Sequence, residues 1–335
     1  MNVDVDLVGG THGTALQAAS VVGHLNIIKL LVLANADPNI KNPNPNLKGG
    51  EYGSALHAAA WVGYQNSVQL LLDANANPNL GGGQYRSALQ AAAYKGNENI
   101  VQLLLRVNAA PNYVADNGGT ALQDAAHRGF QGIVSLLLNA NADPNLVGGD
   151  YGSPLQAAAL EEHWHIIQIL LKANAQPNVI DNDHATALQV AALKGSYNAV
   201  QLLLQANADP NLIGGNYGSA LQIAALKGYK NIVQLLLEAN ADPELVIRHH
   251  LTALQIESGG YVTVFSGIEQ ANVDPMIFGV SHKTALCNAA YHGRLEIVWL
   301  LLQSNANPNT VGCQYGTALH AAAYSGELDI VQLLL

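Results

Sequence analysis

Residues 219–245 read SALQIAALKGYKNIVQLLLEANADPEL, and this stretch predicts a pair of helices that recurs along the chain. Ser219 and Gln222 form a Ser-x-x-Gln capping box, which predicts that a short helix begins there. A glycine ends that helix, and the apolar residues of 231–238 then recur at helical spacing, which predicts a second helix. Asn240 follows at a point where a helix C-terminus favours a left-handed residue, and the proline after it prevents the helix from continuing.

The same stretch recurs along the whole chain. Its opening triplet (Thr or Ser, then Ala or Pro, then Leu) begins at residues 14, 54, 87, 120, 153, 186, 219, 252, 284 and 317. The steps are 33 residues, apart from a first step of 40 and a later one of 32. Such a period is typical of a solenoid, in which a small unit buries its apolar face only by stacking on copies of itself. We therefore expect residues 1–335 to form one all-α solenoid of about ten helix-turn-helix repeats, with extended finger loops and a truncated last repeat.

Three recurring motifs carry a family resemblance: Thr/Ser-Ala-Leu-Gln/His-Ala-Ala, Ile-Val-x-Leu-Leu-Leu and Ala-Asn-Ala-Asp-Pro-Asn. Together they resemble the ankyrin repeat, whose fuller opening motif is Thr-Pro-Leu-His-x-Ala. Pro154 keeps the proline of that motif, and His57 and His320 keep its histidine. The Gly-Gly-x-Tyr-Gly finger at 148–152 resembles long ankyrin arrays of fungal proteins, where the array often follows a nucleotide-binding NACHT-type domain. The ankyrin resemblance implies a protein-binding module.

Three irregularities interrupt the period. Residues 40–46 lengthen one finger, and Glu162 replaces the glycine between the two helices of its repeat. The repeat at 252–277 is degenerate, because Gly267 and Glu269 take the places of two core leucines. An interior glycine and a β-branched run both weaken a helix. We expect the array to open first at this repeat.

Composition and charge exclude several classes of function. The net charge is -10 and charged residues are only 11% of the chain, which argues against non-specific binding of nucleic acid. Apolar runs such as 101–105 are too short to span a membrane. Two cysteines, no Asn-x-Ser/Thr sequon and no secretory signal favour a reducing, cytoplasmic compartment.

The two ends of the sequence resemble parts of repeats. Residues 2–10 resemble the tail of a preceding repeat, and residues 330–335 stop inside a second helix. Solenoids normally need terminal repeats with a polar outer face for solubility. We therefore expect the chain to belong to a longer array, and its apolar ends, notably Leu333 to Leu335, to associate end to end.

The sequence does not favour catalysis, a cofactor or a metal site. It contains no phosphate-binding loop, nucleophile elbow or zinc-protease motif. His250 and His282 occupy equivalent places in adjacent repeats, but stacked helices lie roughly 8–10 Å apart and a metal–nitrogen bond is about 2 Å. Cys287 near a helix start and Cys313 in a finger are not expected to form a disulfide. We predict that the chain is not an enzyme.

The ten copies form an internal alignment that separates structural positions from free ones. Positions filled alike in most copies serve the stack, whereas exposed positions that change are free to serve a partner. One variable set lies at the end of each first helix, which the ankyrin resemblance places on the concave face. Aromatic residues and arginine are enriched in binding hot spots. The candidate partner-binding residues of this set are Trp61, Tyr94, Lys95, His127, Arg128, Lys194, Lys227, Tyr291, His292 and Tyr324.

Tyrosines in the finger loops are the second candidate set. They are Tyr52, Tyr85, Tyr151, Tyr217 and Tyr315. In one interpretation these rings stack along the fingers and rigidify them, since aromatic residues pack well on extended surfaces. In the other, their ring edges contact a ligand.

Basic residues recur at one position of this face: Lys95, Arg128, Lys194 and Lys227, with Glu161 interrupting the column. Acidic finger residues lie across the same groove: Asp116, Asp150 and Asp183. These charges either pair or stay solvated, or the basic column receives an acidic, partly aromatic segment of a protein partner. The sequence thus predicts protein–protein recognition, and the alternative is a structural spacer or a self-assembling array.

Overall fold

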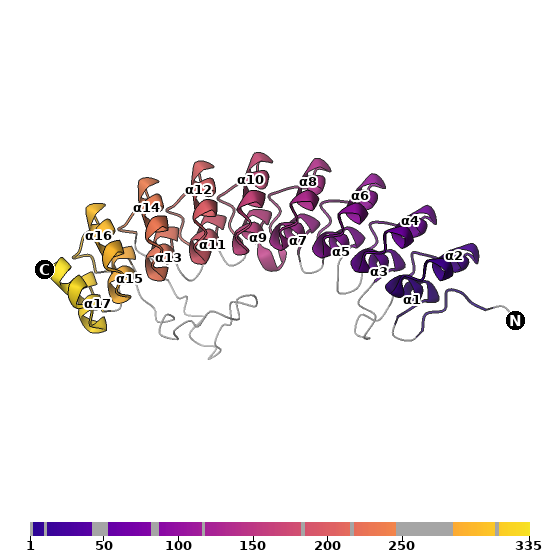
Figure 1. The fold of residues 1–335 in the computed structure, drawn as a ribbon, viewed down its shortest axis with the longest axis horizontal. Coiled ribbons are helices and arrows are strands. Elements are labelled where there is room, and N and C mark those ends of the chain that lie inside the picture. Colours follow the sequence, from indigo (N-terminus) through magenta and orange to yellow (C-terminus); the bar gives the residue numbers. More distant parts are fainter. Residues whose placement is uncertain are drawn as a thin grey trace, which may run out of the picture. The chain divides into compact units, whose positions relative to one another are not determined.

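The computed structural model describes residues 3–9, 12–41, 53–81, 87–115, 118–181, 185–214, 218–245, 284–311 and 315–335. Within these residues, eighteen α-helices follow one another in pairs, and the β-structure is limited to isolated bridges (Figure 1). We call the first helix of each pair helix A, the second helix B, and the segment that leads to the next pair the finger loop. This arrangement confirms the all-α solenoid that the sequence predicts.

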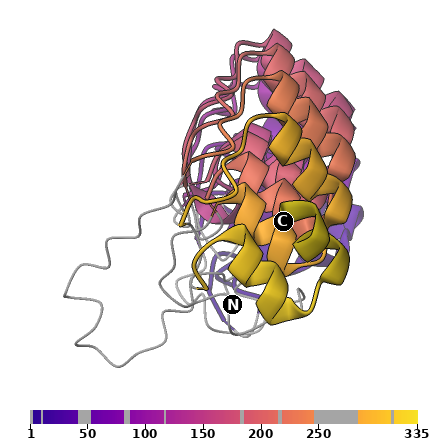
Figure 2. The same cartoon turned by 90° about the vertical axis from the view of Figure 1, so that its left-hand side faces the viewer.

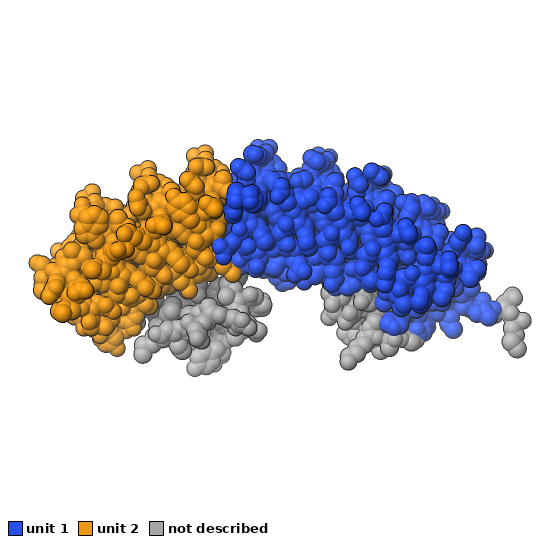
Figure 3. Space-filling model, in the orientation of Figure 1, with its two compact units in different colours: residues 1–175 blue, residues 176–335 orange. Residues whose placement is uncertain are grey.

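The helix pairs fall into two compact units, Met1–Ala175 and Gln176–Leu335 (Figure 3). The first unit contains α1 (Ala15–Val22), α2 (Leu25–Leu33), α3 (Ala55–Val62), α4 (Gln65–Asp73), α5 (Ala88–Lys95), α6 (Glu98–Arg106), α7 (Ala121–Arg128), α8 (Gln131–Asn139), α9 (Pro154–Leu160) and α10 (Trp164–Lys172). The second contains α11 (Ala187–Lys194), α12 (Tyr197–Gln205), α13 (Ala220–Lys227), α14 (Lys230–Glu238), α15 (Ala285–Tyr291), α16 (Leu295–Gln303), α17 (Ala318–Ser325) and α18 (Leu328–Leu334).

Within each unit, every helix A packs on the next helix A and every helix B on the next helix B. Alanines such as Ala58, Ala59 and Ala60 of α3 are completely buried, and these small side chains let neighbouring helices A approach closely. Val68 and Leu71 of α4 fill the space between the two layers and are also completely buried. The connecting segments lie on one side of the helix pairs (Figure 2), which leaves the ends of the helices A beside the finger loops.

The recurring glutamine of the opening motif has two roles. In α7, the Thr120 hydroxyl accepts a hydrogen bond from the Gln123 amide N–H, and Gln123 Oε1 accepts one from the Thr120 N–H at 2.6 Å, as the capping-box motif predicts. The Gln123 side-chain amide also donates to the carbonyl of Leu146 at 3.0 Å and to that of Gly152. The glutamine therefore both caps helix A and anchors the following finger loop.

The abundant asparagines have structural roles at the other end of each repeat. Asn240 has a φ of 62°, which confirms the left-handed conformation predicted at the end of helix B. In the finger that follows α4, Asn79 Nδ2 donates to the Asn108 carbonyl at 3.2 Å, and Asn79 Oδ1 accepts from the Ala110 N–H at 2.6 Å. The same pair of hydrogen bonds to the next repeat is made by Asn39, Asn112, Asn178 and Asn211.

Within the second unit, the order of stacking differs from the expected one after α14. Helix α13 packs directly on α15, and α14 packs on α16, although residues 246–283 separate these pairs in the sequence. Glu244 replaces the bridging asparagine there, and its carboxylate accepts from the Asn307 N–H at 2.7 Å. The sequence predicted that the repeat at 252–277 would stack between these two pairs. Their direct contact contradicts that position, and residues 252–277, with their predicted weakness, lie outside the described residues.

Candidate functional site

The ends of the helices A and the neighbouring finger loops form a surface that we call the finger-side surface. Most of the described candidate residues lie on it in two groups, one in each compact unit. The first row comprises Trp61, Tyr94, Lys95, His127, Arg128, Tyr151 and Glu161. The second row comprises Tyr291, His292, Tyr315, Tyr324 and Ser325.

The first row begins with two stacked rings and two cations. The rings of Trp61, in α3, and Tyr94, in α5, are nearly parallel, with their centroids 5.6 Å apart. Lys95 Nζ lies 4.1 Å from the centroid of the Trp61 ring, and Arg128 Cζ lies 4.9 Å from that of Tyr94. Both distances are typical of cation–π contacts. The two basic side chains are exposed, so each presents its charge to solvent while its position is fixed by a ring.

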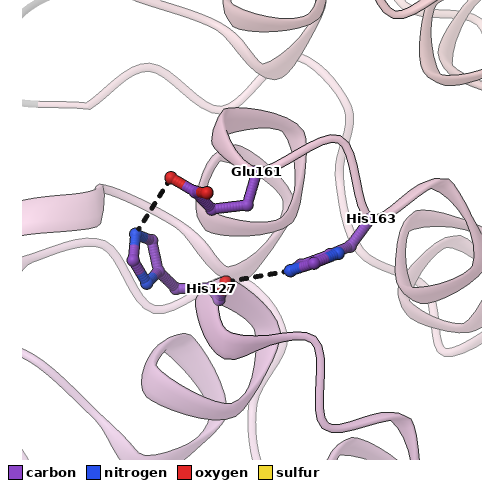
Figure 4. A network of polar contacts seen from close by, with 3 residues as sticks. All are labelled: His127, Glu161 and His163. Atoms are coloured by element: carbon purple, nitrogen blue, oxygen red, sulfur yellow. Dashed lines mark hydrogen bonds and ion pairs between the residues drawn. The ribbon is translucent and has the colours of Figure 1, made fainter.

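His127 extends this row into a polar cluster. Its ring stacks on Tyr151 of the finger loop with a centroid distance of 3.9 Å, and its Nε2 lies 3.5 Å from Glu161 Oε1. The backbone carbonyl of His127 is 3.1 Å from His163 Nε2, at the start of α10 (Figure 4). Asp124, one turn earlier on α7, is completely buried. The row therefore changes from aromatic and cationic residues to a mixed acid–imidazole cluster.

One geometric rule relates the pairs of the first row. Lys95 lies 34 residues after Trp61, Arg128 lies 34 after Tyr94, and Glu161 lies 34 after His127. Because the repeat is 33 residues, the residue one position beyond the equivalent ring position contacts the ring of the preceding repeat. The identity of that one residue therefore decides which group lies on each ring.

The second row consists of stacked tyrosines. The Tyr291 and Tyr315 rings lie 5.3 Å apart at 7°, and the Tyr315 and Tyr324 rings lie 4.2 Å apart at 21°. The Tyr291 and Tyr324 centroids are 6.4 Å apart, and His292 meets Tyr291 edge-on. Ser325 is the residue 34 positions after Tyr291, and its hydroxyl donates back to the Ala321 carbonyl at 2.9 Å.

The basic column predicted from the sequence separates into two kinds of residue. Lys95 and Arg128 lie on aromatic rings, whereas the residues 34 positions before Lys194 and Lys227 are leucines. Among the described residues, no ion pair joins this column to Asp150, the described one of the three finger acids. The expectation that finger acids pair with the column is therefore not met at Asp150, while Asp116 and Asp183 lie outside the described residues.

Both finger tyrosines that the structure describes contact helix A. Tyr151 stacks on His127 and Tyr315 stacks on Tyr291, so both fingers join the rows on the finger-side surface. Stacking of the rings along the fingers stays a prediction of the sequence. Tyr52, Tyr85 and Tyr217 lie outside the described residues.

Searches for other kinds of site gave negative results within the described parts of the chain. No group of three or more His, Cys, Asp or Glu side chains there is arranged to hold a metal ion. No described helix is long and apolar enough to cross a membrane. Cys287 is buried near the start of α15, and Cys313 lies outside the described ranges.

The sequence analysis did not single out three exposed aromatic residues, Tyr64, Tyr197 and Trp299, of which Trp299 is the most exposed. Trp299 of α16 is 51% exposed at a helix B position that is glutamine in most other repeats. Leu295 precedes it by four residues, which places it on the same side of the helix, and it is also exposed. The internal alignment could have revealed this residue if its comparison of variable positions had included helix B.

Comparison with known families identifies the repeat. A family model described as ankyrin repeats (3 copies) matches residues 1–82, 56–148, 132–214, 155–247 and 249–335. A comparison with curated proteins found no match. The narrower resemblance to fungal NACHT-associated arrays stays a prediction. Since the family model covers nearly the whole sequence and the described helices form the expected stacked pairs, the chain belongs to the ankyrin repeat family.

Proposed function

We propose that this chain recognises a protein partner through its finger-side surface, with the first row as the main contact. Ankyrin repeats are generally protein–protein interaction modules. The observation that carries the proposal is the alignment of Trp61, Tyr94, Lys95 and Arg128 across three successive repeats. Aromatic rings and arginine are the side chains most often found in interface hot spots. Here they are already ordered against one another, which lowers the entropy lost on binding.

The chemistry of the first row favours an acidic, partly aromatic partner segment. Lys95 and Arg128 present exposed charges above ring faces, inside a chain whose net charge is -10. Positive groups set in an otherwise acidic molecule attract a carboxylate to one place and repel basic segments elsewhere. An extended segment that alternates acidic and aromatic residues would place its carboxylates on the cations and its rings beside Trp61.

A peptide probe tests this proposal. We expect a labelled peptide of alternating Glu and Tyr to bind more tightly than a matched peptide of Gln and Tyr, with an affinity that falls as salt rises. Changing Lys95, Arg128, Lys194 and Lys227 together to Gln should slow association and flatten its salt dependence. The matched control is Gln102→Ala, which changes an exposed residue of α6. If the quadruple variant binds at the wild-type rate in low salt, the basic column is ordinary solvated surface.

The aromatic contribution needs a separate variant. We expect Trp61→Ala to weaken binding of the same peptide by about tenfold, because it removes both a contact surface and the support of Lys95.

The structural role as a spacer or self-assembling array stays a prediction of the sequence. Sedimentation velocity at low and high protein concentration separates the alternatives, since end-to-end association raises the sedimentation coefficient as the protein concentration rises, whereas a monomer keeps the same coefficient.

A further inference from the structure

The second row departs from the first at the position that supplies the cation. Lys95 and Arg128 each lie on the ring that precedes them by 34 residues. The equivalent residue for Tyr291 is Ser325, whose hydroxyl donates to the Ala321 and Ala322 carbonyls of its own helix at 2.9 and 3.3 Å. A serine side chain is too short to reach a ring in the neighbouring repeat. Among the described residues, the second row thus has stacked rings like those of the first row, but position 325 supplies no cation to Tyr291.

The surroundings of the second row are acidic. Between residues 284 and 335 the sequence has one Lys or Arg, namely Arg294, and three acidic residues, Glu296, Glu327 and Asp329, of which Glu296 pairs with Lys230 of α14 at 3.0 Å. Arg294 stands at the start of α16, where its guanidinium lies against Gly228 of the preceding described repeat. It therefore occupies the turn between helices. The field of this region favours the approach of a positive group from outside.

We propose that the second row binds an arginine-bearing basic segment of a protein partner, with the guanidinium lying on the tyrosine rings where the first row places a cation of its own. A guanidinium is planar and weakly hydrated, and it stacks on aromatic faces more readily than an ammonium does. The hydroxyls of Tyr291 and Tyr324 can accept hydrogen bonds from its N–H groups. The inference rests on the proposed use of the finger-side surface for protein recognition and adds a second specificity to it.

The experiment measures how tightly an arginine-containing peptide binds, before and after Ser325→Lys places a lysine of the chain beside the Tyr291 ring. The probe is a short uncharged-spacer peptide of Gly, Ser and Arg, with matched peptides in which Lys or Gln replaces Arg. We expect the Arg peptide to bind wild-type protein most tightly and to shift the backbone amide signals of Tyr291, Tyr324 and Ser325 in NMR titrations. Ser325→Lys should weaken that binding by about tenfold, because its ammonium would occupy the face of Tyr291. Ser325→Ala is the matched control and should bind within twofold of wild type.

A reciprocal variant tests the same rule in the first row. Lys95→Ser removes the cation from Trp61 and should create a second site for the Arg peptide, detected as new amide shifts at Trp61. Unchanged thermal unfolding of each variant shows that the fold is kept. Equal binding of the Arg and Gln peptides, or equal binding to wild type and Ser325→Lys, overturns the inference.

The two proposals fail in different ways. If the Arg peptide does not bind while the acidic peptide still binds the first row, the proposed function stands and the second-row inference is wrong. If a proline-rich peptide without Arg binds the tyrosines as tightly as the Arg peptide, ring contact alone explains the surface and the inference is also wrong. Failure of both charged peptides removes the proposed function as well.

Discussion

The first and second rows use the same backbone positions and differ in what lies on the rings. In the first row, Lys95 and Arg128 lie over the rings of Trp61 and Tyr94 from the preceding repeat, and Glu161 meets Nε2 of His127, whose ring face stacks on Tyr151. In the second row, Ser325 stands at that position and tyrosines contact one another instead. The repeat scaffold thus fixes where a ring and its neighbour meet. A single variable residue in each repeat then decides whether a ring face is used internally or presented to a partner.

The rows also differ in how firmly their finger loops are anchored. Gln123 donates two hydrogen bonds from its side chain to the finger that carries Tyr151. The equivalent residue below Tyr315 is Cys287, whose Sγ lies 3.9 Å from the Gly316 carbonyl. A thiol is a weak donor, and 3.9 Å is a long contact even for sulfur. The side chain at this position therefore donates two amide hydrogen bonds to the finger of the first row, whereas in the second row it makes a long thiol contact with the Gly316 carbonyl.

The largest expected effect comes from removing the anchor of the first row. Gln123 is buried, and Gln123→Ala deletes three hydrogen bonds while leaving the Leu146 and Gly152 carbonyls without that donor. Because each lost bond costs about 0.5–1.5 kcal/mol, we expect the free energy of unfolding to fall by about 2–4 kcal/mol. Urea unfolding followed by circular dichroism measures this change. The exposed control Gln102→Ala should stay within about 0.5 kcal/mol of wild type, and an equally small loss for Gln123→Ala would show that the finger is not anchored by this side chain.

Glu162 directly follows Glu161 of the first row, and its substitution is expected to have the next largest effect on stability. It has a φ of 59° at a position where the other described helices A end in glycine. A side chain other than glycine in this conformation costs roughly 1–2 kcal/mol. Glu162→Gly should therefore stabilise the protein by about 1 kcal/mol in urea unfolding, after the entropy of the added glycine is considered.

Gly129→Ala is the control for Glu162→Gly, because it makes the opposite change at the equivalent position of the preceding repeat. A Cβ at Gly129, whose φ is 80°, would approach the His163 ring to 2.8 Å. This variant should be less stable than wild type. If both variants destabilise the protein, contacts of the Glu162 side chain outweigh its backbone strain.

The second row is expected to gain stability when the glutamine of the other repeats replaces Cys287. Cys287→Gln restores the residue found at this position in most other repeats, and its amide can donate to the Gly316 carbonyl. Since one new hydrogen bond contributes about 1 kcal/mol, unfolding should require that much more free energy. Cys287→Ser, whose hydroxyl is shorter than the amide, should give no gain. A loss of stability for Cys287→Gln would mean that the space beneath the finger at Tyr315 is too small for the side chain.

The fold was predictable from the sequence because its signals are local and recur. The capping box at Thr120, the left-handed Asn240 and the helix B leucines each specify their own turn or layer. The candidate residues were predictable as a class for the same reason, since variable positions stand out against a repeated background. Trp299 shows the limit of this procedure, because the comparison of variable positions covered the ends of the helices A and the finger loops but not helix B.

Contacts between repeats were harder to predict. The finger acids and the basic column appeared complementary in the sequence, yet Lys95 and Arg128 lie on rings of the preceding repeat. Whether a basic side chain contacts an acid or a ring depends on how far it extends toward the neighbouring helix, about one helix spacing away. The repeat period does not give this distance. The direct packing of α13 on α15 was equally absent from the period, and Glu244 accepts a hydrogen bond from the Asn307 N–H across that junction.

The smallest expected effect tests the rule that joins the two rows. A double-mutant cycle with Trp61→Leu and Lys95→Ser should give a coupling of about 0.5–1 kcal/mol in the free energy of unfolding, the range for an exposed cation–π contact. In the second row, Ser325→Lys combined with Tyr291→Leu should give a coupling of similar size, because the same 34-residue relation brings the new ammonium to the ring. Coupling in the first row alone would show that stacking on Tyr315 and Tyr324 already fills the face of Tyr291. In that case a partner's arginine would have no place on that ring. The coupling energy of the second row therefore shows whether the two rows differ only at residue 325 or also in the geometry of their rings.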